Sequence, residues 1–349
     1  MMNITNPICN SRGPSSDVPL TPEHGGPILC MDSNNEIVVT GSTDHGLRVY
    51  SLITGKQQKE LYNKSYGHTE WVTCVKILPD GRIASGGMDS KICIWESVGV
   101  KCKYLTDHSG SISSIKCDEK GILLSSSYDS SIRIYDLNSP NSSIGLLNGV
   151  HKGAITTFEW KNSLCVSGGR DGNIGIWDIN KETCINSQKA HNGQMSKIKF
   201  HSDESDTNLI VSVGMNDGVL SAIDMRTHSK IFSKRIHSGS INFMESNNSN
   251  LLITGSADKT IKVLDVTKNF EEIAVMKATD SIFCGDLYES TLVIGCGDGN
   301  LLTYNLDTFE CIYGYGADEK GVVKNIKIMP EKKKVIATGE SGKGMILLF

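Results

Sequence analysis

The chain has 349 residues, of which 38% are hydrophobic, and its formal net charge is −4. The apolar fraction is sufficient for a packed core, whereas the acidic balance gives no general attraction for nucleic acid or for an anionic membrane. No apolar run approaches the roughly 20 residues of a membrane-spanning helix, and the N-terminal residues lack the apolar core of a signal peptide. We therefore expect a soluble intracellular protein, cytoplasmic or nuclear, with no nucleic-acid or membrane partner.

The eleven cysteines lie singly along the chain and form no C-x-x-C pair. This distribution predicts neither a structural zinc site nor a disulfide framework. Several cysteines, such as Cys74, Cys93 and Cys284, fall inside apolar runs, where a reduced thiol acts as a small hydrophobe. The cysteines therefore favour a reducing compartment, and we expect no metal and no cofactor.

A unit of about 40 residues repeats from residue 18 to the end of the chain. The clearest copy, residues 67–97, consists of a histidine, an apolar strand, an Asp-Gly turn, a second strand, an aspartate turn and a strand that ends in tryptophan. Residues 107–137 and 150–179 copy it closely. Further copies begin at His191 and His237, and residues 281–306 and 322–349 keep the strand pattern without the histidine.

Each unit contains three short β-rich runs separated by turn residues, and a fourth run leads to the next unit. Segments 56–62, 101–106 and 230–236 are such fourth runs. Four strands per unit are therefore expected. Eight sets of inner strands can be counted, whose last strands end near Tyr50, Trp95, Tyr135, Trp177, Ile223, Leu264, Tyr304 and Phe349.

The period, together with the markers Gly67-His68 and Trp177-Asp178, resembles the WD-repeat family of β-propellers. The resemblance implies an all-β fold: a single closed propeller, monomeric, with eight four-stranded blades over residues 18–349, after a flexible tail over residues 1–17. A seven-bladed propeller with one degenerate unit is the alternative. The last unit ends without an outer strand, so we expect residues 18–21 to pair with it and complete the last blade.

A histidine, a serine or threonine, an aspartate and an aromatic residue recur in four units. The sets are His24, Thr40, Asp44 and Tyr50; His68, Ser85, Asp89 and Trp95; His108, Ser125, Asp129 and Tyr135; and His151, Ser167, Asp171 and Trp177. These are hydrolase residue types, but an enzyme needs such a set once, with an exposed nucleophile on a sharp turn. The resemblance implies instead a buried hydrogen-bond network, so we expect no enzymatic activity. Covalent labelling of a single serine would be needed to support a hydrolase.

Later units lose members of this set, since Ile223 and Leu264 replace the aromatic residue and Gly342 replaces the aspartate. We expect these units to be held less firmly.

The resemblance also implies which residues look onto the top face of the propeller, namely the residue before each turn aspartate and those three and five after each histidine. Large side chains occupy several of these positions: Trp71, Met88, Tyr128, Arg170, Phe283 and Lys324. Aromatic, Met and Arg side chains dominate interface energies, so we expect this cluster to bind a partner. The alternative interpretation is that Trp71 and Phe283 plug the mouth of the central channel or pack on the neighbouring blade.

The sequence therefore predicts a non-catalytic scaffold that binds a peptide or protein partner on its top face, within a multiprotein complex. A second hypothesis is a substrate receptor of a cullin-type ubiquitin ligase. Residues 223–226, Ile-Asp-Met-Arg, resemble the Trp-Asp-x-Arg sequence of receptors for the damaged-DNA-binding adaptor, although the tryptophan is missing.

Overall fold

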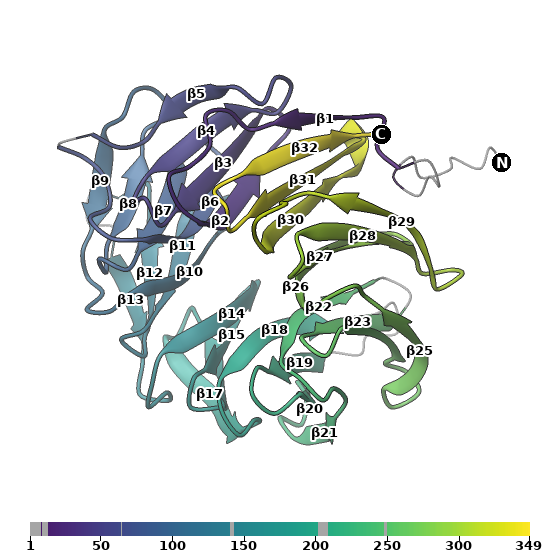
Figure 1. Cartoon of the computed structure of the whole chain (residues 1–349). Helices are drawn as coiled ribbons and strands as arrows, with labels where there is room; N and C mark the ends of the chain where they lie inside the picture. The colour runs from purple at the N-terminus through teal and green to yellow at the C-terminus, as the bar shows by residue number, and fades with distance from the viewer. Residues whose placement is uncertain (1–7, 9–12, 64, 140–142, 202–208, 248–249) are drawn as a thin grey trace. The chain divides into compact units, whose positions relative to one another are not determined.

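The computed structural model describes residue 8 and residues 13–63, 65–139, 143–201, 209–247 and 250–349 (Figure 1). Within these residues it contains strands β1 to β32 and one short 3-10 helix, η1 (Pro330–Lys332). The strands form eight antiparallel four-stranded sheets. The fold is an eight-bladed β-propeller, which confirms the expected fold class and excludes the seven-bladed alternative.

We number the sheets as blades 1 to 8. The strands of blades 1 to 4 are β2 (Ile28–Ser33), β3 (Ile37–Ser42), β4 (Leu47–Ser51) and β5 (Gln57–Glu60); β6 (Val72–Ile77), β7 (Ile83–Gly87), β8 (Ile92–Trp95) and β9 (Cys102–Leu105); β10 (Ile112–Cys117), β11 (Ile122–Ser127), β12 (Ile132–Asp136) and β13 (Ser143–Leu147); β14 (Ile155–Lys161), β15 (Leu164–Gly169), β16 (Asn173–Asp178) and β17 (Thr183–Lys189).

The strands of blades 5 to 8 are β18 (Met195–His201), β19 (Leu209–Gly214), β20 (Val219–Asp224) and β21 (Lys230–Arg235); β22 (Ile241–Ser246), β23 (Leu251–Ser256), β24 (Thr260–Asp265) and β25 (Glu271–Lys277); β26 (Ile282–Tyr288), β27 (Thr291–Cys296), β28 (Asn300–Asn305) and β29 (Glu310–Gly316); β30 (Val323–Met329), β31 (Lys334–Gly339), β32 (Gly344–Leu348) and β1 (Ser16–Pro19).

The chain divides into two compact units. Unit 1 comprises Met1–Val38, Arg48–Lys59 and Asn242–Phe349, and unit 2 comprises Val39–Leu47 and Glu60–Ile241. Blades 2 to 5 therefore belong to unit 2, and blades 6 to 8 belong to unit 1 from Asn242 onward.

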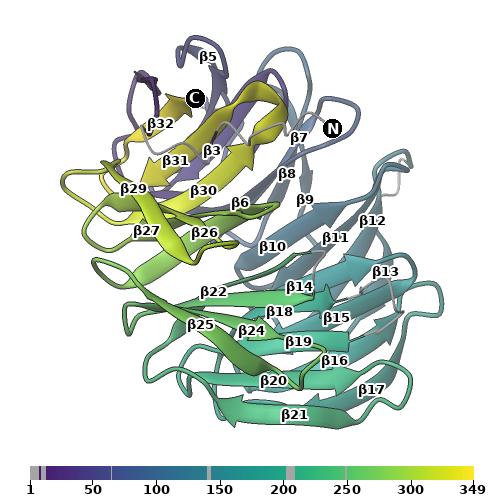
Figure 2. The same cartoon turned by 90° about the vertical axis from the view of Figure 1, so that its right-hand side faces the viewer.

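In unit 2, apolar side chains pack between neighbouring sheets. Figure 2 shows the sheets of blades 3 to 5 lying one beside the next. Second strands such as β7 and β19 are buried along their whole length, whereas the fourth strand β21 is almost entirely exposed. This gradient explains why the second strands are rich in apolar and small residues. One cluster joins blades 2 and 3, with Ile92 and Ile94 against Ile112 and Leu123. Equivalent clusters join blades 3 and 4 and blades 4 and 5.

In unit 1, the N-terminal strand completes the last blade, as expected from the sequence. Strand β1 pairs antiparallel with β32, with Val18 opposite Ile346, and the two strands lie side by side in Figure 1. The following residues continue the attachment, since Leu20 N–H donates to Gly344 O (2.8 Å) and Thr21 N–H donates to Gly55 O (2.9 Å). The first and last strands of the chain thus share one sheet, and β32 is not left as a free edge.

The tail expected over residues 1–17 is described only at Ile8 and from Gly13 onward, and its other residues lie outside the described part. Strand β1 begins at Ser16, two residues before the expected boundary. Ile8 is fully buried in a cluster with Val293, Val323 and Leu347. A truncation that removes Ile8 therefore also removes a core contact of blades 7 and 8.

No helix in the described part of the chain is long and apolar enough to cross a membrane.

Candidate functional site

The histidine-serine-aspartate sets of blades 2 and 4 form the same chain of hydrogen bonds. In blade 2, His68 Nδ1 lies 3.0 Å from Asp89 Oδ1, and His68 Nε2 lies 2.8 Å from Ser85 Oγ. Trp95 Nε1–H donates to the same Ser85 Oγ (2.9 Å). In blade 4 the corresponding distances are 3.2, 2.7 and 2.8 Å, between His151 and Asp171, His151 and Ser167, and Trp177 and Ser167.

The protonation of these sets follows from the bonds and their burial. Burial opposes ionisation of Asp89, but the hydrogen bond and charge of His68 outweigh it and hold the pKa of that carboxyl below its usual range. Burial lowers the pKa of His151 despite the opposing effect of Asp171, so His151 is neutral at neutral pH. A neutral ring donates from Nδ1 to the carboxylate and accepts the serine proton at Nε2. The serine oxygen then accepts the indole N–H.

This arrangement is unsuited to nucleophilic catalysis. Ser85, Ser125 and Ser167 are each 0% exposed, so a substrate carbonyl has no access to their hydroxyls. A catalytic serine needs open space beside its oxygen and donors for the oxyanion. In blades 2 and 4 a tryptophan N–H occupies that side of the serine. The sets connect the histidine before the first strand and the turn that carries the aspartate to the second and third strands of the same blade.

Blades 1 and 3 keep the histidine but replace the tryptophan with tyrosine. In blade 3, His108 Nδ1 lies 2.7 Å from Asp129 Oδ2, and His108 Nε2 lies 2.8 Å from Ser125 Oγ. Tyr135 is fully buried in the indole's place. In blade 1, His24, Thr40 and Tyr50 are buried, and Asp44 Oδ1 accepts the Gly46 N–H (3.0 Å). Tyr50 OH donates to the main-chain oxygen of Pro22 (2.8 Å).

Blade 5 shows how the set weakens. Ser212 and Asp217 are five positions apart, whereas Ser85 and Asp89 are four apart. The extra residue changes the turn, and His191 Nδ1 lies 3.5 Å from Asp217 Oδ2, with no hydrogen bond formed by that nitrogen. Met215, rather than Asn216, makes the main-chain bond that precedes the turn.

In blade 8, an aspartate and a serine replace the histidine and the turn aspartate of the other sets. Asp318 is 2% exposed and stands where blades 1 to 6 have histidine. Its Oδ2 accepts hydrogen bonds from the Ser341 hydroxyl (2.7 Å) and the Ser341 N–H (3.1 Å). Ser341 therefore occupies the position of the turn aspartate. The sequence comparison aligns Gly342 with that aspartate, but the structure places Gly342 one position later. Its backbone φ is positive there (84°), as it is at the equivalent Gly172 (75°).

The blade 2 set can be tested by melting. Asp89→Ala removes the acceptor of His68 Nδ1–H and Thr69 N–H, and we expect a loss of about 2 kcal/mol because buried donors are left unpaired. The melting temperature should fall by about 4–6 °C, measured by differential scanning calorimetry. Asp217→Ala is the matched control and should lower it less, because Asp217 makes no bond to His191. Equal melting of both variants and wild type would rule out a stabilising role.

The residues predicted to bind a partner fall on both units, and four of them lie on unit 2. We call Trp71, Met88, Tyr128 and Arg170 the rim patch. Trp71, Met88 and Tyr128 are 45%, 40% and 48% exposed, and Arg170 is also exposed.

Main-chain bonds place the rim-patch residues on successive blades. Met88 N–H donates to Trp71 O (2.9 Å), and Ser111 Oγ–H reaches from blade 3 to Met88 O (3.4 Å). Tyr128 N–H donates in turn to Ser111 O (2.9 Å), and Arg170 repeats the arrangement in blade 4 with Ala154 O (2.7 Å). The turns are thus held by main-chain groups, so the fold does not require these large side chains.

The residues five after each histidine serve another purpose than the sequence suggested. In blades 2 to 5 this residue is the extra residue of a β-bulge in the first strand, as at Thr73 and Thr156. Thr156 Oγ1–H donates to Met195 O (2.8 Å), the first residue of the next blade's inner strand. Thr73 and Ser196 donate to the equivalent residues of blades 3 and 6, and Asn242 donates to that of blade 7. These polar side chains join neighbouring blades.

Blades 7 and 8 of unit 1 break this pattern with a pair that we call the bulge pair, Phe283 and Lys324. Both are bulge residues, but neither makes such an interblade bond. Lys324 Nζ lies 5.0 Å from the centre of the Phe283 ring, within cation–π range, and 3.9 Å from Glu340 Oε1. Phe283 remains 36% exposed. A Cβ at Gly297 would lie 3.2 Å from Phe283 Cε2, so this glycine leaves room for the ring.

Repeated four-stranded blades, two of which contain a complete Asp-His-Ser-Trp hydrogen-bond chain, place the protein in the class of β-propellers built from sequence repeats. The family model "WD domain, G-beta repeat" matches residues 18–51, 57–96, 99–136 and 229–265. The chain belongs to the WD-repeat β-propeller family. This assignment supports a role in protein interaction, and the family is generally non-catalytic.

Similar proteins include two named "p21-activated protein kinase-interacting protein 1-like". The one from Danio rerio is 22% identical over 56% of this chain and 63% of its own length, and the one from Gallus gallus is 27% identical over 67% and 62%. WD repeat-containing protein 1 of Xenopus tropicalis is 28% identical over 66% of this chain and 38% of its own. The chain thus matches less than two thirds of the length of these relatives.

Solved structures share the fold at low identity. The computationally designed Ika8 protein superposes with a TM-score of 0.83 at 21% identity, over 95% of this chain and 99% of its own. Saccharomyces cerevisiae Sqt1 superposes with a TM-score of 0.80 at 16% identity, over 93% and 96%. At such identities the likeness concerns the fold alone.

Proposed function

We propose that this protein is a non-catalytic scaffold that binds a peptide or protein partner through the rim patch of unit 2. The observation that carries the proposal is the exposure of the Trp71, Met88 and Tyr128 side chains. Main-chain hydrogen bonds hold the turns at these residues, so the side chains are not needed for that purpose. Trp, Tyr and Arg are the residue types that contribute most to interface energies. The remaining exposed large hydrophobic residues on the fourth strands are aliphatic, such as Ile185 and Ile231.

The rim patch also indicates what kind of partner it would bind. Arg170 forms no salt bridge within the described residues, and its guanidinium can bind a carboxylate with two parallel hydrogen bonds. The aromatic residues on blades 2 and 3 offer apolar surface beside it. We infer a segment with an apolar or aromatic residue followed by an acidic residue. The names of the Danio rerio and Gallus gallus relatives describe an interaction with a protein kinase, which agrees with a binding role.

The bulge pair of unit 1 is proposed as a smaller contact site for a partner. We also propose that the chain acts as a monomer in a reducing compartment, the cytoplasm or the nucleus. The ten cysteines that the structure describes are all free thiols, which is consistent with this location. The net charge of −4 gives nucleic acid no general attraction.

The test is affinity capture from cells followed by quantitative mass spectrometry. A tagged Trp71→Ala/Arg170→Ala variant should lose the partner that wild type enriches, because both the apolar anchor and the charge are removed. Val98→Ala is the matched control, since Val98 lies in the same blade and is 84% exposed. Recovery of the same proteins with the double variant would contradict the proposal.

The same capture distinguishes the ubiquitin-ligase hypothesis. Arg226 is exposed and lies 3.4 Å from Asp224, whereas Ile223, which stands in place of the tryptophan, is fully buried. Recovery of the damaged-DNA-binding adaptor that depends on Arg226, and not on Trp71, would favour a receptor of that ligase over the scaffold.

A further inference from the structure

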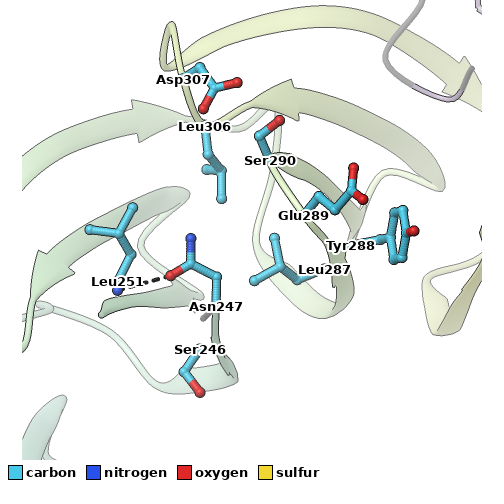
Figure 3. Close-up of a pocket in the computed structure, with 9 residues that line it drawn as sticks. All are labelled: Ser246, Asn247, Leu251, Leu287, Tyr288, Glu289, Ser290, Leu306 and Asp307. Carbon is cyan, nitrogen blue, oxygen red and sulfur yellow. Dashed lines mark hydrogen bonds between the residues drawn. The ribbon is translucent and has the colours of Figure 1, made fainter. Parts of the chain in front are cut away.

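A pocket with a volume of about 700 Å³ lies between the hairpin ends of blades 6 and 7 (Figure 3). We call it the hairpin pocket. Its lining comes from the β22–β23, β26–β27 and β28–β29 connections. Leu287 and Tyr288 end strand β26, whereas Phe283 lies at its start, so the pocket is about five residues, or roughly 17 Å, from the bulge pair. It is therefore separate from the bulge pair.

The hairpin pocket has leucine side chains around its centre, polar side chains beside them and two carboxylates at its margin; the polar residues are Ser246, Asn247 and Ser290. Leu251, Leu287 and Leu306 extend around its centre, and the carboxylates of Glu289 and Asp307 lie at its margin (Figure 3). Neither carboxylate has a salt-bridge partner among the residues that the structure describes. The negative charge of Glu289 raises the pKa of the neighbouring Tyr288 hydroxyl.

Two other gaps between blades, both within the residues that the structure describes, carry different charges. The gap between blades 3 and 4 has almost the same volume, about 720 Å³, but its charged lining is mixed. The gap between blades 4 and 5 is smaller, about 340 Å³, and its charged side chains are basic. The charged lining residues are Glu289 and Asp307 in the hairpin pocket; Lys116, Asp118, Glu119 and Lys120 between blades 3 and 4; and Lys161 and Arg226 between blades 4 and 5.

We propose that the hairpin pocket is a second binding site, which accepts a lysine or arginine side chain from a protein partner. Such a side chain has a long apolar stem and a terminal cation. The stem would pack against Leu251 and Leu287, which are half-buried, and the cation would lie near the carboxylates of Glu289 and Asp307. The volume lies within the range of small-ligand sites, and a partner held here leaves the rim patch of unit 2 free for another.

The proposal can be tested with small probes on the full chain. N-acetyl-lysine methylamide, N-acetyl-arginine methylamide and the uncharged N-acetyl-norleucine methylamide are titrated to about 50 mM, and amide shifts are followed by NMR. We expect saturable shifts at Leu287, Tyr288 and Leu306 with the two cationic probes. The norleucine probe has the same stem as lysine, and it should bind at least tenfold more weakly. Equal binding of all three probes, or no saturable shift, would overturn the proposal.

Two variants separate a specific site from general attraction. Glu289→Gln/Asp307→Asn keeps the shape and removes both charges, so it should reduce the binding of the cationic probes to the level of norleucine. Trp71→Ala should bind all probes as wild type does, which keeps this result independent of the rim patch. Amides of the mixed-charge gap, such as Lys120, should not shift. Unchanged probe binding by the double variant, with an unchanged melting temperature, would exclude the site.

Discussion

Deletion of residues 1–23 should abolish cooperative melting and cause aggregation. The deletion removes β1, which supplies the outer strand of blade 8, and exposes the edge of β32. It also removes Leu20, which is 1% exposed among Tyr50, Ile336 and Ile346. Loss of such a buried leucine alone costs about 2–5 kcal/mol, a large part of the 5–15 kcal/mol that typically stabilises a fold. Size-exclusion chromatography and calorimetry provide the measurement.

Shorter deletions act as graded controls for this result. Removal of residues 1–6 should leave melting unchanged, whereas removal of residues 1–13 should lower the melting temperature because it takes away the buried Ile8. The point variant Leu20→Ala keeps the β1 pairing and should fall between the two longer deletions. A monodisperse product of the 1–23 deletion that melts like wild type would contradict closure of blade 8 by the N-terminal strand.

The sequence predicted the fold because the same restraints recur in most of the blades. Turn aspartates, buried second strands and histidines 40–46 residues apart in the first six units repeat often enough to reveal four strands per unit. Closure by residues 18–21 followed from simple counting, since the last unit lacked an outer strand. Ile8 could not be predicted in the same way, because one apolar residue in a polar segment carries no periodic signal.

The candidate site was less predictable than the fold. Aligned positions identified Trp71 and Tyr128, because the residue three after a histidine and the residue before a turn aspartate can both be counted from the sequence. The bond from Thr156 to the next blade could not be counted, since it depends on a β-bulge that places the hydroxyl beside Met195 O. The sequence did contain one signal for the bulge pair, because Phe283 and Lys324 stand where blades 2 to 6 have Thr, Ser or Asn.

The hairpin pocket was not predicted because its residues belong to three different connections. Leu251, Leu287 and Leu306 each look like an ordinary strand residue in the sequence, and Glu289 and Asp307 look like ordinary turn residues. Only the packing of blade 6 against blade 7 brings them together. The charged residues that line each of the three gaps likewise come together only when neighbouring blades pack.

Replacement of Trp71 by alanine should weaken the binding of a captured partner about 30-fold, which corresponds to about 2 kcal/mol. The indole is 45% exposed in the free protein, so a partner can still bury much of its surface. The substitution keeps Trp71 O, the acceptor of Met88 N–H, and the turn should therefore retain its conformation. Isothermal titration calorimetry gives the affinity, and a melting curve of the same variant verifies the fold.

Two further variants decide whether the rim patch acts as a unit. Arg170→Ala should weaken binding and make the remaining affinity less sensitive to salt, because the proposed bond to an acidic residue is lost. Val98→Ala should bind like wild type. Full affinity of Trp71→Ala and Arg170→Ala, with loss of binding in a bulge-pair variant such as Phe283→Ala, would move the main partner site from unit 2 to unit 1. In that case the exposed aromatic residues on blades 2 and 3 would have no role in this interaction.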